Sequence, residues 1–129
     1  MLNRRMFLSF AGTLAVSPIG FAQQPARKVA LYANVGAHLL HYDVDIAGAA
    51  LRRQQNIMLP GMVQYAWPHV SHRYLYVATS SMSNHGHSHQ LTALRIDAAS
   101  GALARHGESV RLPARPIHLT TDIPSRHIL

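Results

Sequence analysis

Residues 59–76 read LPGMVQYAWPHVSHRYLY, and residues 112–129 read LPARPIHLTTDIPSRHIL. The two stretches align without a gap at an offset of 53 residues, which pairs Tyr65 with His118. Repeats with a period of about 20–50 residues are typical of solenoids and propellers, whose units cannot bury their apolar faces alone. The repeat therefore predicts an architecture of stacked or radial units.

Short apolar runs separated by turn residues follow a polar linker over residues 23–28, and no stretch has a sustained helical period. Tyr74–Thr79 (YLYVAT) is the clearest strand, because it is rich in aromatic and β-branched residues. We expect Ser80–His89 to be a long polar loop. The other expected strands are Val29–Asn34, Leu39–Asp45, Leu51–Met58, Val63–Trp67, Gln90–Ile96, Leu103–Val110 and Ile117–Thr121.

This order gives four short strands per unit of about 45–53 residues, which is the period of a β-propeller blade. The fold is predicted to be all-β, with about two four-stranded antiparallel blades of a propeller over residues 29–129. Propellers close with about four to eight blades, so two blades leave long edges and apolar faces exposed. We expect a fragment or a truncated reading frame that stops within a strand at Leu129 and is inactive by itself.

Residues 1–22 have the order of an export signal. Arg4 and Arg5 precede a short apolar run, and small residues lead to a cleavage site after Ala22. The pattern of Arg4, Arg5, Phe7 and Leu8 resembles a bacterial twin-arginine signal. The resemblance implies that the twin-arginine export machinery carries the folded protein to the periplasm. The apolar run is too short for a membrane span of about 20 residues, so no stable membrane anchor is expected.

The composition narrows the classes of function. Of the 129 residues, 48% are hydrophobic and 13% are charged, as in a globular protein. The chain has no cysteine, which excludes disulfides, thiolate metal sites and a cysteine nucleophile. The net charge of +7 favours anionic partners, but the chain has no run of lysines and arginines, so no nucleic acid is expected as a partner.

Several short motifs follow one another in a characteristic order over residues 29–129. They are the strand Tyr74–Val77, the strand end Arg95–Asp97, the turn Ser100–Leu103, and the entry segments Leu59–Gln64 and Pro116–Asp122. In order and spacing they are similar to the blades of the lactonase-type seven-bladed propeller family, which includes bacterial 6-phosphogluconolactonase. The resemblance implies hydrolysis of a sugar lactone such as 6-phosphogluconolactone, and we expect no cofactor. The export signal departs from the cytoplasmic enzyme of this family.

Lactone hydrolysis requires a base that activates water, a donor for the developing oxyanion and a cradle for substrate anions. In a four-stranded meander, the segment that enters strand one and the loop between strands two and three emerge at the same end. Arg115 and His118 belong to an entry segment. His118 is the candidate general base, and Arg115 is the candidate group that binds an anionic sugar lactone. Alternatively, His118 caps a turn or bonds backbone within the ring.

His85, His87 and His89 belong to the loop between strands two and three, at the same end as Arg115 and His118. Alternate residues of an extended segment point the same way, so three imidazoles could converge on zinc, copper or nickel. The segment is rich in glycine and serine and has no carboxylate nearby, so we favour a solvated loop over a metal site.

Asp45 and Asp97 each follow a strand, at equivalent places in two units. Recurrence at a turn is typical of an aspartate that accepts hydrogen bonds from the turn backbone. We therefore predict that these carboxylates hold turns and do not form a catalytic pair.

Two other functions are compatible with the sequence. The first is a periplasmic propeller that binds or scaffolds without catalysis. The second is a cycloisomerase that acts on a carboxylated lactone, because the lactonase-type family also hosts that chemistry. A fold does not decide between them.

Overall fold

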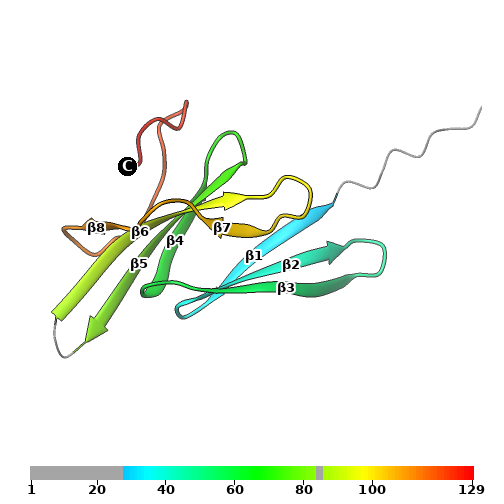
Figure 1. The fold of residues 1–129 in the computed structure, drawn as a ribbon, viewed down its shortest axis with the longest axis horizontal. Helices are drawn as coiled ribbons and strands as arrows, with labels where there is room; N and C mark the ends of the chain where they lie inside the picture. Colours follow the sequence, from blue (N-terminus) through cyan, green and yellow to red (C-terminus); the bar gives the residue numbers. More distant parts are fainter. Residues whose placement is uncertain (1–27, 84–85) are drawn as a thin grey trace, which may run out of the picture.

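The computed structural model describes residues 28–83 and 86–129, and this part of the chain forms strands and no helix. A three-stranded antiparallel sheet contains β1 (Val29–Val35), β2 (His38–Asp45) and β3 (Ala50–Met58) in that order. The second, five-stranded sheet has the order β4 (Met62–Pro68), β5 (Tyr74–Ser83), β6 (Gly86–Ile96) and β7 (Leu103–Arg105), and β8 (Val110–Leu112) also pairs with β6. The prediction of an all-β chain with consecutive antiparallel strands is confirmed (Figure 1).

The expected export signal lies outside the described residues, and so does most of the linker. This concerns Arg4, Arg5, Phe7, Leu8 and the cleavage site after Ala22. Within residues 28–83 and 86–129 no helix could cross a membrane.

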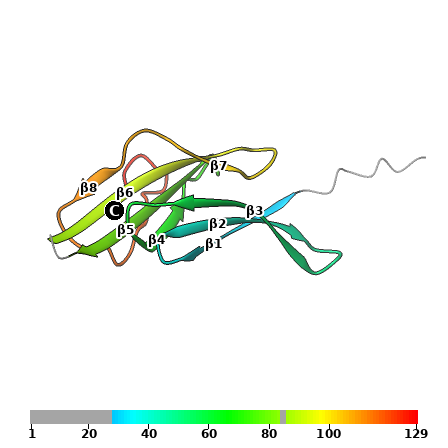
Figure 2. The same cartoon turned by 60° about the horizontal axis from the view of Figure 1, so that its bottom comes forward.

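The two sheets pack face to face on alternate apolar residues, and Figure 2 shows them as two layers. Leu75 and Val77 of β5 and Leu94 of β6 lie on one face of the five-stranded sheet and are at most 6% exposed. Leu39 of β2 joins them from the three-stranded sheet. Burial of each such side chain contributes about 1.5–3 kcal/mol. It also fixes the register, because a slip by one residue would turn every leucine to solvent.

The chain crosses from one sheet to the other between β3 and β4. The amides of Leu59 and Val63 donate to the carbonyl groups of Ala37 and Gly36, each at 2.9 Å, in the turn between β1 and β2. Gly61 is buried against the backbone of β5, where a Cβ atom would lie 2.7 Å from the carbonyl carbon of Ser80. This close approach sets where β4 begins beside β5.

The repeat found in the sequence recurs in the backbone. His72 has a φ of 55°, and its amide donates to the carbonyl oxygen of His69 at 2.8 Å. At the offset of 53 residues, Ser125 has a φ of 53°, and its amide donates to the carbonyl oxygen of Asp122 at 2.8 Å. The same left-handed turn therefore follows β4 and the segment that aligns with β4.

The strand register recurs as well. Trp67 of β4 pairs with Tyr76 of β5. The aligned residues Thr120 and Leu129 pair through N–H···O bonds of 3.1 and 2.9 Å, one in each direction. The predicted strand Ile117–Thr121 is wrong as an extended strand, because its pairing is limited to these two hydrogen bonds and the adjacent bridge between Thr121 and Ile128.

Two other sequence predictions of local structure are wrong. Ser80–His89 is a hairpin and not a long loop, because β5 continues to Ser83 and β6 begins at Gly86. The polar composition of this segment does not indicate a strand, yet its backbone belongs to a continuous antiparallel ladder in which Ser80 pairs with His89. The predicted strand Leu103–Val110 is interrupted, since Gly107 adopts a left-handed φ of 72° between β7 and β8.

Candidate functional site

Arg115 and His118, the predicted site residues, lie beside β4 on the exposed segment that follows β8. The Nη2 and Nε groups of Arg115 donate to Oε1 of Gln64 at 2.9 and 3.2 Å. The imidazole of His118 lies tilted against the phenol ring of Tyr65, with 4.5 Å between the ring centroids. The structure thus brings together an imidazole, a guanidinium group and two side chains of β4.

Contact between Tyr65 and His118 joins two positions that the sequence repeat aligns. A further contact between the two copies of the repeat lies just past the end of β4, where the amide of Val70 donates to Oγ of Ser125 at 3.1 Å. The second copy of the repeat, residues 112–129, therefore lies alongside β4 of the first copy.

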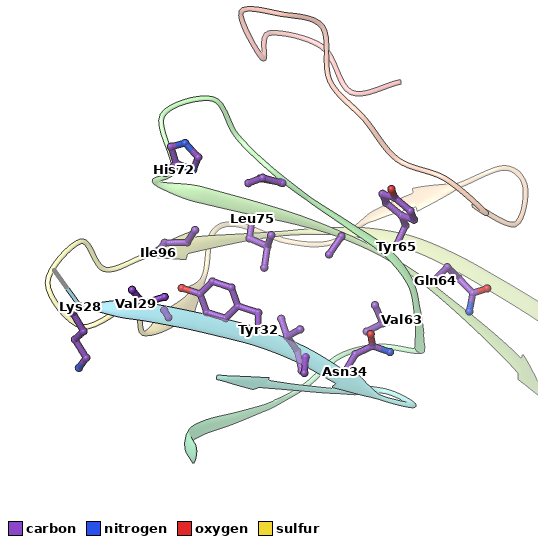
Figure 3. A pocket seen from close by; sticks show the side chains of 15 residues that line it. Lys28, Val29, Tyr32, Asn34, Val63, Gln64, Tyr65, His72, Leu75 and Ile96 are labelled. Atoms are coloured by element: carbon purple, nitrogen blue, oxygen red, sulfur yellow. The ribbon is translucent and has the colours of Figure 1, made fainter. Parts of the chain in front are cut away.

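A groove with a volume of about 870 Å³ runs between β1 and β4 (Figure 3). Its apolar wall includes Tyr32 of β1, Leu39 of β2, Val63 of β4 and Leu75 of β5. Lys28, Asn34, Gln64 and His72 add polar groups. Ligand pockets of about 300–1,000 Å³ with mostly apolar walls and a few polar groups are typical of small-molecule sites.

The groove and the predicted site share two residues. Gln64 and Tyr65 line the groove, and the same side chains contact Arg115 and His118. Arg115 and His118 themselves are not among the residues that line the groove, so they adjoin it only through Gln64 and Tyr65. The sequence named the cation and the imidazole but gave no sign of the groove, which depends on the packing of the two sheets.

His87 and His89 lie on β6, and His85 lies outside the described residues. His89 pairs with Leu112 of β8, so it lies at the end of the sheet from which the segment with Arg115 and His118 departs. Among the described residues, no hydrogen bond or ring contact joins either histidine to Arg115 or His118. That part of the chain also holds no group of three or more His, Cys, Asp or Glu side chains able to bind a metal ion.

A row of three side chains, one from each strand of the three-stranded sheet, faces the turn before β7. Tyr32 donates its hydroxyl to the carbonyl oxygen of Gly101 at 2.6 Å. Gln55 exchanges two hydrogen bonds with the backbone of Leu103, at 2.8 and 2.9 Å. His41 lies between them and is 2% exposed, yet neither of its ring nitrogens has a hydrogen-bond partner in the described part of the chain.

Burial lowers the pKa of His41 below its ordinary value. The carboxylate of Asp43 acts in the opposite direction and raises this pKa, and its Oδ1 lies 3.8 Å from Nε2 of His41. Lys28 adds to the lowering and pairs with Asp43 at 3.1 Å. The sequence analysis missed His41 as a special residue. The alternation of the strand HLLHYDVD could have indicated this residue, because it puts His41 on the same inward face as Leu39, where a histidine becomes buried.

Asp45 and Asp97 hold turns, as predicted. Oδ1 of Asp45 accepts the amide of Gly48 at 2.9 Å, and Oδ1 of Asp97 accepts the amide of Ser100 at 2.8 Å. The hydroxyl and amide of Ser100 hold the pKa of Asp97 below its ordinary value. Neither carboxylate belongs to the candidate site.

No protein-family model matches this chain, and no curated protein matches its sequence. Over residues 28–83 and 86–129 the structure defines an all-β protein of two antiparallel sheets.

Proposed function

We propose that this chain supplies consecutive blades of an exported lactonase-type β-propeller that hydrolyses a sugar lactone. The observation that carries the proposal is the contact between Tyr65 and His118, which are aligned positions of successive repeats. A second contact between the two copies, from Val70 to Ser125, joins positions that are not aligned. Radial repetition puts equivalent residues of neighbouring blades side by side in this way. The four-stranded meander from β4 to β7 is the size of one blade.

The outer face of the three-stranded sheet also supports a propeller. Strand alternation turns Val29, Leu31 and Leu51 away from the five-stranded sheet, and they are 39%, 39% and 56% exposed. Contiguous apolar surface of this kind marks an interaction site. In a propeller the neighbouring blade covers it. The ring closes with further blades, whether they belong to a longer polypeptide or to other copies of this chain.

In the proposed reaction, the imidazole of His118 takes a proton from water while the water oxygen bonds to the lactone carbonyl carbon. The bond between that carbon and the ring oxygen then breaks, and the ring oxygen receives the proton from the imidazolium. The product is the open hydroxy acid. Gln64 occupies two donor groups of Arg115, and the other N–H groups of the guanidinium bind the phosphate or carboxylate of the substrate.

Hydrolysis of phosphorylated and neutral sugar lactones, followed by proton release, tests this function on the protein in the assembled state in which it is isolated. We expect His118→Ala to lower kcat by about 10²–10⁴-fold, because a general base is lost. Arg115→Gln should raise KM for the phosphorylated lactone and leave the neutral lactone unaffected. The exposed His106→Ala is the matched control.

Unchanged turnover in His118→Ala would remove this residue from the site. Lactone binding without turnover in the unmodified protein would favour a periplasmic binding protein. An isomerised product in place of the hydroxy acid would favour a cycloisomerase.

A further inference from the structure

His87 and His89 form a pair on one face of β6. They are separated by one residue, and the strand period of two directs both side chains to the same side. Their ring planes differ by 10°, and their ring centroids are 6.2 Å apart. The hairpin of β5 and β6 projects away from the three-stranded sheet in both overall views (Figures 1 and 2). His87 is exposed, so a solute can reach the pair.

Ser80 of β5 orients the inner histidine of this pair. Oγ of Ser80 lies 3.1 Å from Nδ1 of His89, and the two residues are cross-strand partners. With Nδ1 protonated and donating to Ser80, the lone pair of Nε2 is free. Histidine ligands of metal ions almost always donate their other ring N–H in this manner, which fixes the tautomer and the ring orientation.

We infer that His87 and His89 bind one divalent transition-metal ion through two imidazole nitrogens, with water in the other coordination positions. Each nitrogen must come within about 2.0–2.1 Å of the ion. With the ring of His89 held by Ser80, the exposed His87 reaches a shared ion by turning its own ring, without displacing core residues. This inference is independent of lactone hydrolysis.

The donor set decides which ion binds. Imidazole suits copper, nickel and zinc, whereas calcium and magnesium require oxygen ligands. Affinity for a given nitrogen site rises from nickel to copper and falls again at zinc. The pair should therefore bind Cu²⁺ more tightly than Ni²⁺ or Zn²⁺, and should not respond to Mg²⁺.

Calorimetric titration with Cu²⁺ tests the pair in a His85→Gln background, so that the signal reports only the two histidines on β6. We expect His87→Ala and His89→Ala each to weaken Cu²⁺ binding more than tenfold. Ser80→Ala should weaken it by about tenfold, the lower end of the usual cost of losing such a supporting hydrogen bond. The exposed His106→Ala should leave the affinity unchanged.

Electron paramagnetic resonance of the Cu²⁺ complex gives a readout that does not depend on stability. The pattern of two coupled nitrogens should become that of one in either histidine variant, while the circular dichroism spectrum is retained. Unchanged Cu²⁺ affinity in both variants would overturn the inference. An equal loss of affinity in His106→Ala would overturn it too, because binding would then be diffuse.

Discussion

Replacing Gly101 by alanine is expected to lower the free energy of unfolding by about 3 kcal/mol, the combined cost of backbone strain and overpacking. Gly101 has a φ of 74°, where an alanine is strained. Its new Cβ would lie 2.7 Å from the Cβ of Ala30 and 3.0 Å from Nε2 of His41. Ala30 cannot move without its strand, so the substitution forces the two sheets apart.

Gly107→Ala is the matched control for this prediction. Gly107 has a φ of 72°, and a Cβ there would have no neighbour within 4 Å. The control keeps the backbone strain and removes the clash, so its expected cost is about 1 kcal/mol. Urea unfolding followed by circular dichroism measures both. Equal losses in the two variants would show that the sheets do not dock on Gly101 as described.

His41→Leu is expected to raise the free energy of unfolding at pH 7 by about 1–2 kcal/mol. His41 is buried with two unpartnered nitrogens, and leucine has a similar size without polar atoms. Replacing an unsatisfied buried polar group by an apolar one removes its desolvation cost. Thermal or urea unfolding of the two proteins measures the difference, and a clear loss of stability would contradict it.

The same variant should remove part of the acid sensitivity. The pKa of His41 is lowered by burial below its ordinary value of 6.5 in the folded protein, so the unfolded chain binds the extra proton first. The contribution of His41 to the free energy of unfolding is constant above pH 6.5. It falls as the pH drops below 6.5 toward the pKa of His41 in the folded protein. The slope reaches at most about 1.4 kcal/mol per pH unit.

Tyr32, Asp43 and Lys28 are the titratable groups that face His41, and all three are retained in the variant. His106→Leu, at an exposed position, controls for the general loss of a histidine. An acid profile of His41→Leu that matches the unmodified protein would show that His41 titrates normally.

The strand order could largely be predicted from the sequence, because the two copies of the repeat adopt the same backbone conformation. The aligned turns at His72 and Ser125 share one conformation although their side chains differ. The role of Asp45 and Asp97 could be predicted for a similar reason. The carboxylate of an aspartate that follows a strand accepts hydrogen bonds mainly from the backbone amides of the next turn. Local patterns are sufficient where the determining contacts are local.

Contacts between the sheets could not be predicted in this way. The burial of His41 and the groove beside Tyr65 depend on which faces of the two sheets pack together, and a local sequence pattern does not predict that packing. The hairpin around Ser80 and His89 was missed because its residues are polar and show no strand pattern. Its β6 strand is held by backbone pairing with β5 on one side and β8 on the other. Arg115 and His118 were predicted as site residues from the strand topology, and their contacts with Gln64 and Tyr65 required the structure.

The central claim is that successive repeats lie side by side, and a pair of engineered cysteines tests it most directly. The chain has no cysteine of its own, so Val70→Cys with Ser125→Cys introduces the only two thiols. The amide of Val70 donates to Oγ of Ser125 at 3.1 Å, so the two segments approach each other closely at these positions. Val70→Cys with Val110→Cys, on exposed β8, is the control pair. We expect mild oxidation to make both thiols of the first pair unreactive and to leave the control pair free; two reactive thiols in the first pair would contradict the claim.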